Sequence, residues 1–131
     1  DWGLGPRIRP ADLYRLPIVS NPPRSAMFRQ IKDWFATAGL EPVRLDLCSS
    51  VAVIGHLVSS GAALGVLPAR MMEDDVRAGR VHVLRPDPDL NHGRVYASYP
   101  EGGLTPPVSA MLKSIQKALD AIDYLKVDGL A

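Results

Sequence analysis

The sequence predicts an α/β protein with a mainly parallel sheet, and three observations lead to this prediction. Short apolar runs of strand length alternate along the 131 residues with segments of helical periodicity. Prolines and glycines fall mostly between these segments, where they separate one element from the next. Apolar residues make up 47% of the chain and charged residues 22%, which is typical of a globular protein. We therefore expect one compact domain.

The first predicted strand covers residues 17–20 and ends at Asn21, because the two prolines that follow cannot continue a sheet ladder. A helical pattern begins at Ser25 and ends at Gly39, a residue type that commonly follows a helix. The apolar side of this helix consists of Met27, Phe28, Ile31, Trp34, Phe35 and Ala38. This part of the chain predicts a strand, a rigid turn and an amphipathic helix.

A second strand and helix follow directly. Residues 43–48 alternate between apolar and polar side chains, which predicts a half-exposed strand. Ser49 or Ser50 then caps a helix over residues 51–59. This helix is apolar on most sides, so we expect it to be well buried. Residues 63–67 form a continuous apolar run, which predicts a strand covered on both faces.

The last part of the chain predicts a short helix, two strands and a long final helix. The short helix is expected at residues 69–77, the strands at residues 81–84 and 94–99, and a Pro- and Asp-rich loop between the strands at residues 85–93. Thr105 is the predicted N-cap of the final helix and Pro106 its first residue. Its apolar stripe comprises Val108, Met111, Leu112, Ile115, Leu119 and Ile122. The alternating order favours parallel strands joined by crossover helices.

The order of elements also predicts where a ligand would bind. In a parallel sheet, ligands lie beyond the carboxyl ends of the strands, beside the N-termini of the helices that follow. This rule selects residues 20–25, 48–50 and 67–70. The serines before the second helix suit an anion, because their hydroxyls and the first-turn N–H groups can bind negative charge. Considered locally, however, one serine simply caps the helix and Arg24 is a solvated loop residue, so both interpretations stay open.

Several motifs, taken together in order and spacing, resemble the effector-binding domain of LysR-type transcriptional regulators. The most specific is the helix, glycine, apolar strand and Leu-Pro block at residues 57–68. The others are Ala11-Asp12-Leu13, Ala38-Gly39-Leu40-Glu41-Pro42, Asp46-Leu47-Cys48-Ser49-Ser50, Ala78-Gly79-Arg80-Val81 and Tyr99-Pro100. The resemblance covers about residues 11–120. One departure is Ala63, which stands where family members often have a second glycine.

The resemblance implies a periplasmic-binding-protein-like fold of type 2, with two α/β lobes and an effector cleft between them. Residues of about 11–90 would form the second lobe, and those of about 94–123 would supply a strand and a C-terminal helix to the first lobe. The rest of the first lobe and an N-terminal winged helix-turn-helix would precede residue 1. The resemblance also implies a homo-oligomer, a dimer or tetramer, that contacts DNA only through that N-terminal domain.

The resemblance further implies which residues contact the effector, a small molecule that we expect to be a carboxylate or other anion. Ser49 matches the position of the family's effector-contacting hydroxyl. The predicted binding residues are Ser20, Asn21, Pro22, Arg24, Ser25, Ser49, Ser50, Leu67 and Pro68. The resemblance implies that the other wall of the cleft is formed by residues outside this sequence.

Composition and motifs exclude several other functions. The net charge of +1, with 15 basic and 14 acidic residues, provides no face for binding nucleic acid, and the apolar runs are too short to cross a membrane. Cys48 is the only cysteine, which excludes an internal disulfide and favours a cytoplasmic setting. We find no catalytic motif, no metal-ligand spacing and no cofactor motif. Two alternatives stay open: a fragment of an extracytoplasmic solute-binding protein and a small α/β hydrolase using a strand-end serine.

Overall fold

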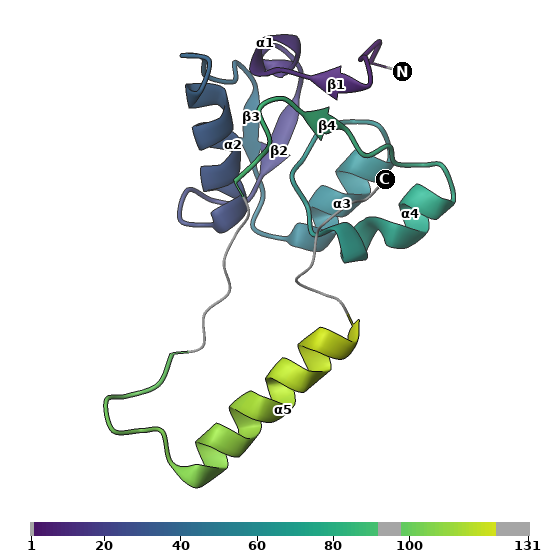
Figure 1. Ribbon diagram of the computed structural model, residues 1–131. Helices are drawn as coiled ribbons and strands as arrows, with labels where there is room; N and C mark the ends of the chain where they lie inside the picture. The colour runs from purple at the N-terminus through teal and green to yellow at the C-terminus, as the bar shows by residue number, and fades with distance from the viewer. Residues whose placement is uncertain (1, 92–97, 123–131) are drawn as a thin grey trace. The chain divides into compact units, whose positions relative to one another are not determined.

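A computed structural model of the chain describes residues 2–91 and 98–122 (Figure 1). The chain divides into two compact units, Asp1–Gly93 and Arg94–Ala131. The first unit contains β1 (Arg7–Ile8), α1 (Pro10–Leu13), β2 (Ile18–Ser20), α2 (Ala26–Ala36), β3 (Leu45–Leu47), α3 (Val51–Ser59), the 3₁₀ helix η1 (Ala69–Met72), α4 (Glu73–Arg77) and β4 (Arg85–Pro86). The second unit contains α5 (Pro106–Ile122). The protein is thus a mixed α/β structure, as the sequence predicts.

Strand β2 is the centre of a small parallel sheet. It pairs with β3, so that Ile18 lies opposite Leu45 and Ser20 opposite Leu47. On its other edge, the Val19 N–H donates to the Leu64 carbonyl over 2.9 Å, and the Leu64 N–H donates to the Pro17 carbonyl over 2.9 Å. The predicted strands at residues 17–20 and 43–48 are therefore confirmed in their central residues.

The prediction of a full strand at residues 63–67 is wrong, because the structure has only a single parallel bridge between Leu64 and Ile18. The residue directly after the bridge is Gly65, and a glycine inside a strand weakens it.

A second parallel pair joins the two ends of the first unit. Strand β1 pairs with β4, with Arg7 opposite Arg85, and the Asp87 N–H donates to the Ile8 carbonyl over 2.8 Å. The predicted strand at residues 81–84 is wrong: pairing begins at Arg85, inside the segment expected to be a loop. The strand predicted at residues 94–99 lies, except for its last two residues, outside the described part of the chain.

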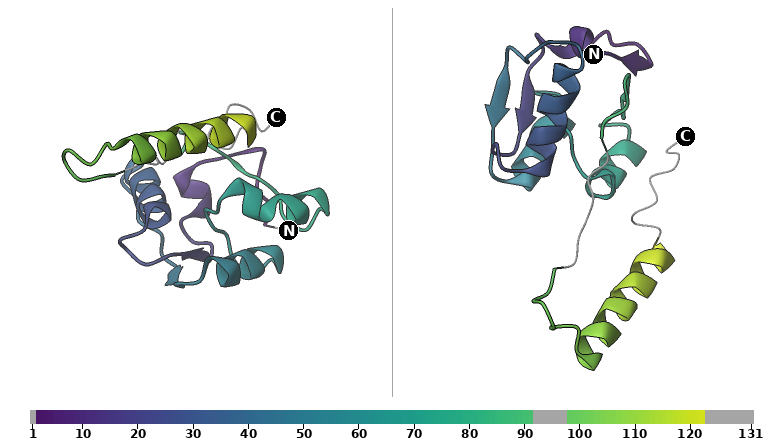
Figure 2. Two further views of the ribbon diagram at one scale, coloured as in Figure 1. Left: turned by 90° about the horizontal axis from the view of Figure 1, so that it is seen from below. Right: turned by 60° about the vertical axis from the view of Figure 1, so that its left-hand side comes forward.

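Helix α2 supplies much of the core of the first unit. Figure 2 shows it running alongside β2 and β3. The buried cluster consists of Ile8, Leu13, Ile18, Ile31, Trp34 and Phe35. The Trp34 ring meets Phe35 edge to face, with centroids 5.3 Å apart. Trp34 Nε1 also donates to the Pro88 carbonyl over 2.6 Å, and Gln30 Nε2 to the Asn91 carbonyl over 2.6 Å. These two bonds attach the 85–91 segment to α2.

Helix α3 has the predicted bounds but not the predicted burial. Only Ile54 and Gly55 are buried, and Val53 is 48% exposed. The inner side of this helix packs closely on the bridging segment, because a Cβ at Gly65 would lie 3.2 Å from Val58 Cγ2 and 3.5 Å from Ile54 Cγ2. Helix α5 begins at Pro106 as predicted, and its apolar stripe includes two residues that are about half exposed, Met111 and Ile115.

Candidate functional site

Two helix N-termini lie at the same edge of the sheet. Because β2 and β3 are parallel, both strands end at this edge, and α2 and α3 follow them. Ser25 caps α2 by accepting a hydrogen bond from the Phe28 N–H over 3.1 Å. Ser50 caps α3 by accepting one from the Val53 N–H over 3.4 Å. Of the two serines that the sequence left open as caps, the structure therefore selects Ser50.

Hydrogen bonds join the ends of the two strands directly. The Cys48 N–H donates to the Ser20 carbonyl over 2.8 Å, and Asn21 Nδ2 donates to the Cys48 carbonyl over 3.1 Å. The turn after β2 is thereby fixed against the turn after β3. The predicted segments at residues 20–25 and 48–50 thus meet in the structure.

Two polar atoms at this edge are buried without a partner. Ser20 is 2% exposed and Asn21 is 5% exposed. Ser20 Oγ and Asn21 Oδ1 have no hydrogen-bond partner within the residues that the structure describes. Most buried polar atoms in proteins do have one, so each such atom calls for an explanation. Both belong to residues that the sequence places in the candidate site.

The other predicted site residues lie at or near the surface. Ser49, Pro22 and Arg24 are exposed, and the Arg24 carbonyl accepts a hydrogen bond from Arg29 Nη1 over 3.1 Å. Leu67 is half-buried and Pro68 is exposed. These last two residues follow the bridge at Leu64 and lead into η1, so they belong to the third chain segment that leaves the sheet.

A second feature, which the sequence did not indicate as a site, is an open depression between α3 and the η1–α4 segment. Its volume is about 320 Å³. It is lined by Ala52, Gly55, His56, Ser59, Met71, Met72 and Asp75. The local signal for it is the glycine inside α3, because a Cβ at Gly55 would lie 2.8 Å from Met71 Cε. The glycine lets the two methionine side chains of η1 pack directly against the backbone of α3.

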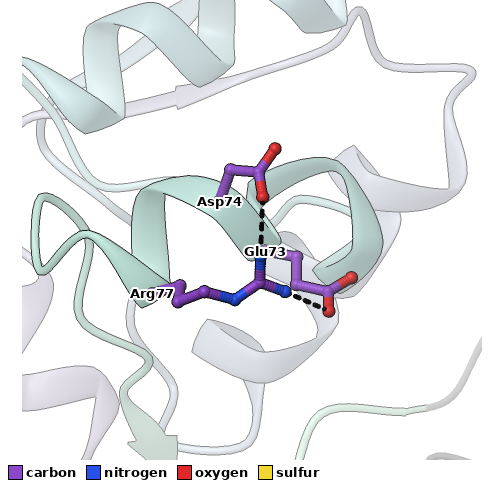
Figure 3. Close-up of polar contacts among 3 residues, drawn as sticks. All are labelled: Glu73, Asp74 and Arg77. Atoms are coloured by element: carbon purple, nitrogen blue, oxygen red, sulfur yellow. Dashed lines mark hydrogen bonds and ion pairs between the residues drawn. The ribbon is translucent and has the colours of Figure 1, made fainter.

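The acidic residues of α4 are paired with arginines. Arg77 contacts Glu73 over 2.9 Å and Asp74 over 3.1 Å (Figure 3), and Arg80 Nε lies 2.7 Å from Asp75 Oδ1. Across the described ranges, no three His, Cys, Asp or Glu side chains are grouped to hold a metal ion. This acidic run is therefore a solvated face with ion pairs, each of which contributes little to stability.

One protein family matches most of the chain. A protein-family model described as the LysR substrate binding domain matches residues 2–120. No curated protein and no solved structure matches the chain significantly. Among the described residues, no helix has the length and apolar character needed to span a membrane.

Proposed function

The chain belongs to the family of LysR substrate binding domains, and from this premise we propose that it binds a small anionic effector at the carboxyl edge of β2 and β3. Domains of this family are the ligand-binding parts of transcriptional regulators and have a periplasmic-binding-protein-like fold. The observation that carries the proposal is the meeting of two capped helix N-termini at one sheet edge. Such an arrangement attracts negative charge from two directions.

The serine turn before α3 is the centre of the proposed site. The cap is made by Ser50, so the exposed hydroxyl of Ser49 is not required for it. An effector carboxylate beside Ser49 would accept a hydrogen bond from this hydroxyl and from the N–H groups of Val51 and Ala52, since the Val53 N–H already donates to Ser50. Arg24 in the neighbouring turn adds a positive charge on the exposed side. The remaining contacts would come from Ser20, Asn21, Pro22, Ser25, Leu67 and Pro68.

The rest of the proposal concerns how binding acts on transcription. Residues of about 11–90 would form the second lobe, and those of about 94–123 would return to the first; the division of the chain after Gly93 supports this assignment. An effector between the lobes would shift the population of closed forms and change the spacing of DNA-binding domains in a cytoplasmic homodimer or tetramer. Catalysis has no part in this proposal.

Replacing Ser49 with alanine tests the site. In the full-length protein, Ser49→Ala should weaken effector binding by at least about tenfold, because a hydrogen bond to a charged group contributes roughly 1.5–3 kcal/mol. It should leave the stability of the unliganded protein nearly unchanged. Ser50→Ala should instead lower the free energy of unfolding by about 1 kcal/mol, since it removes the cap. Titration calorimetry with small mono- and dicarboxylates and denaturant unfolding measure the two effects.

Ser60→Ala provides a matched control at the other end of α3, where the Ser60 hydroxyl donates to the Leu57 carbonyl over 3.0 Å. It should not change effector binding. If an acid binds the Ser49→Ala protein as tightly as the wild type, the site is placed wrongly. If no small acid binds the full-length protein or alters its DNA footprint, the proposed sensing function itself fails.

A further inference from the structure

The side-chain amide of Asn21 has a fixed orientation. Its Nδ2 donates to the Cys48 carbonyl over 3.1 Å. If the amide were turned over, two carbonyl oxygens would face each other there, which is repulsive, so the network determines which atom is nitrogen. The oxygen, Oδ1, is then the atom left without a partner. An amide oxygen can only accept a hydrogen bond.

The two turns at the ends of β2 and β3 set the charge next to Asn21. Neither of the segments at residues 20–25 and 48–50 contains a carboxylate. The nearest one along β3 is Asp46, which is exposed and pairs with Val19, so its carboxylate lies in solvent roughly 6–7 Å back along the strands from Asn21. An ammonium group placed at Asn21 Oδ1 would lose its water without gaining a counter-charge, whereas a hydroxyl loses far less.

From these observations, and resting on the proposed function, we propose that the effector carries a neutral hydrogen-bond donor, a hydroxyl or an amide N–H, next to its acidic group, and that Asn21 Oδ1 accepts it. Ser20 Oγ, the second buried atom without a partner, both donates and accepts, so it can serve either group of the effector. Both atoms are covered in this structure, so binding as proposed includes a rearrangement of the turn after β2 that breaks its hydrogen bonds to Cys48 and uncovers them. The preferred class of effector is then a small hydroxy acid or N-acyl acid rather than a plain carboxylic acid or an amino acid.

Three sets of matched acids test this preference on the full-length protein by titration calorimetry. They are propionate, lactate and alanine; succinate, malate and aspartate; and phenylacetate, mandelate and phenylglycine. Within each set only the group next to the carboxylate changes, from hydrogen to hydroxyl to ammonium. In a set whose size fits the site, the hydroxy acid should bind at least about tenfold more tightly than the other two members, because a site built around a hydrogen bond discriminates against a ligand that lacks it.

Substitution of Asn21 assigns the preference to its side chain. In Asn21→Leu the advantage of the hydroxy acid over the plain acid should fall to less than about threefold. Circular dichroism and denaturant unfolding report whether the variant keeps its fold. Asn91→Leu, the same change at an exposed asparagine, should keep the full preference. If Asn21→Leu does not fold, titration of the wild-type protein with the nine acids still shows whether the effector needs a neutral hydrogen-bond donor.

The outcomes separate this inference from the proposed function. If acids bind but the hydroxy member has no advantage, or the amino acid binds best, the neutral donor is wrong while the sensing function stands. If the hydroxy acid keeps its advantage in Asn21→Leu, another group accepts the hydrogen bond from the hydroxyl. The role proposed for Asn21 is then wrong. If none of the nine acids binds, the proposed function fails and this inference fails with it.

Discussion

At the scale of single residues, the most informative groups are the buried ones without partners. An unsatisfied buried donor or acceptor costs roughly 1–3 kcal/mol, whereas a helix cap contributes about 1 kcal/mol. Each of the oxygens of Ser20 and Asn21 therefore lowers stability by at least about as much as the Ser25 or Ser50 cap raises it. Polar residues that are costly for folding at the end of a strand are typical of binding sites, where a ligand supplies the missing partner.

The pair of Lys32 and Glu41 gives a prediction about pH. The hydrogen bond from Lys32 Nζ to Glu41 Oε1, 2.6 Å long, and the positive charge of Lys32 lower the pKa of Glu41 below its ordinary value of 4.5. A carboxyl whose pKa is lower in the folded state stabilises the fold above its unfolded pKa, and this contribution is lost as the pH falls through the folded pKa. Glu41→Gln should thus destabilise the protein slightly near neutral pH and not in stronger acid.

Denaturant unfolding near neutral pH and in stronger acid measures the loss of stability in Glu41→Gln. High salt should reduce this loss, because the Lys32–Glu41 pair is exposed. Glu101→Gln, the same change at an exposed glutamate, serves as the control. An equal loss of stability from Glu41→Gln at both pH values would show that the ion pair with Lys32 is not its cause.

At the scale of elements, α2 connects the sheet to a segment that is distant in sequence. Its buried face includes Trp34 and Phe35, and the Trp34 indole N–H also binds the Pro88 carbonyl. An indole is well suited to this position, because its ring fills the core while its N–H binds at the edge of the core. The segment at residues 85–91 thereby stays close to α2, although along the chain it follows α4.

Trp34→Phe should lower the free energy of unfolding by roughly 1–3 kcal/mol, since it leaves the Pro88 carbonyl without its donor and reduces the volume of the core. Trp2→Phe is the matched control: Trp2 is 38% exposed, so the same change there should cost less than about 0.5 kcal/mol. Unfolding in urea measures both, and hydrogen exchange at Asp87 should accelerate in Trp34→Phe only. Equal losses from the two variants would mean that the indole hydrogen bond does not hold this segment.

At the scale of the whole molecule, the charges are balanced and dispersed. The 15 basic and 14 acidic residues give a net charge of +1, and several arginines, such as Arg77 and Arg80, are paired with acidic neighbours. Affinity for DNA depends mainly on the number of phosphates that lysine and arginine neutralise. A chain with this charge balance offers few groups that could neutralise phosphates.

We therefore predict that the purified 131-residue chain, shown to be folded by circular dichroism, does not retard DNA in a mobility-shift assay at physiological salt. The full-length regulator should retard its operator under the same conditions, with an affinity that falls steeply as salt rises. Salt-dependent retardation by the 131-residue chain alone would contradict the prediction and place a DNA-binding surface on this domain.

The family and the three longest helices could be predicted from the sequence alone. The order and spacing of the motifs between residues 11 and 120, with the block at residues 57–68 as the most specific, identified the LysR family, and α2, α3 and α5 begin where the serine and proline signals predicted. Helices are predictable because their hydrogen bonds join residues four positions apart, so the periodicity of the stripe and the residues at each end contain most of the information. The roles of the individual site residues, with Ser49 foremost, stay predictions.

The strand pairing and the state of the polar atoms at the candidate site depend on contacts between distant parts of the chain. Strand β4 forms at Arg85 because β1, far away in sequence, lies beside it, and the run at residues 63–67 pairs with β2 only at Leu64. That Asn21 turns its nitrogen to Cys48 and leaves its oxygen without a partner likewise depends on β3 lying next to β2. Strand pairs and buried contacts join segments that are remote along the chain, so no local pattern of residues specifies them.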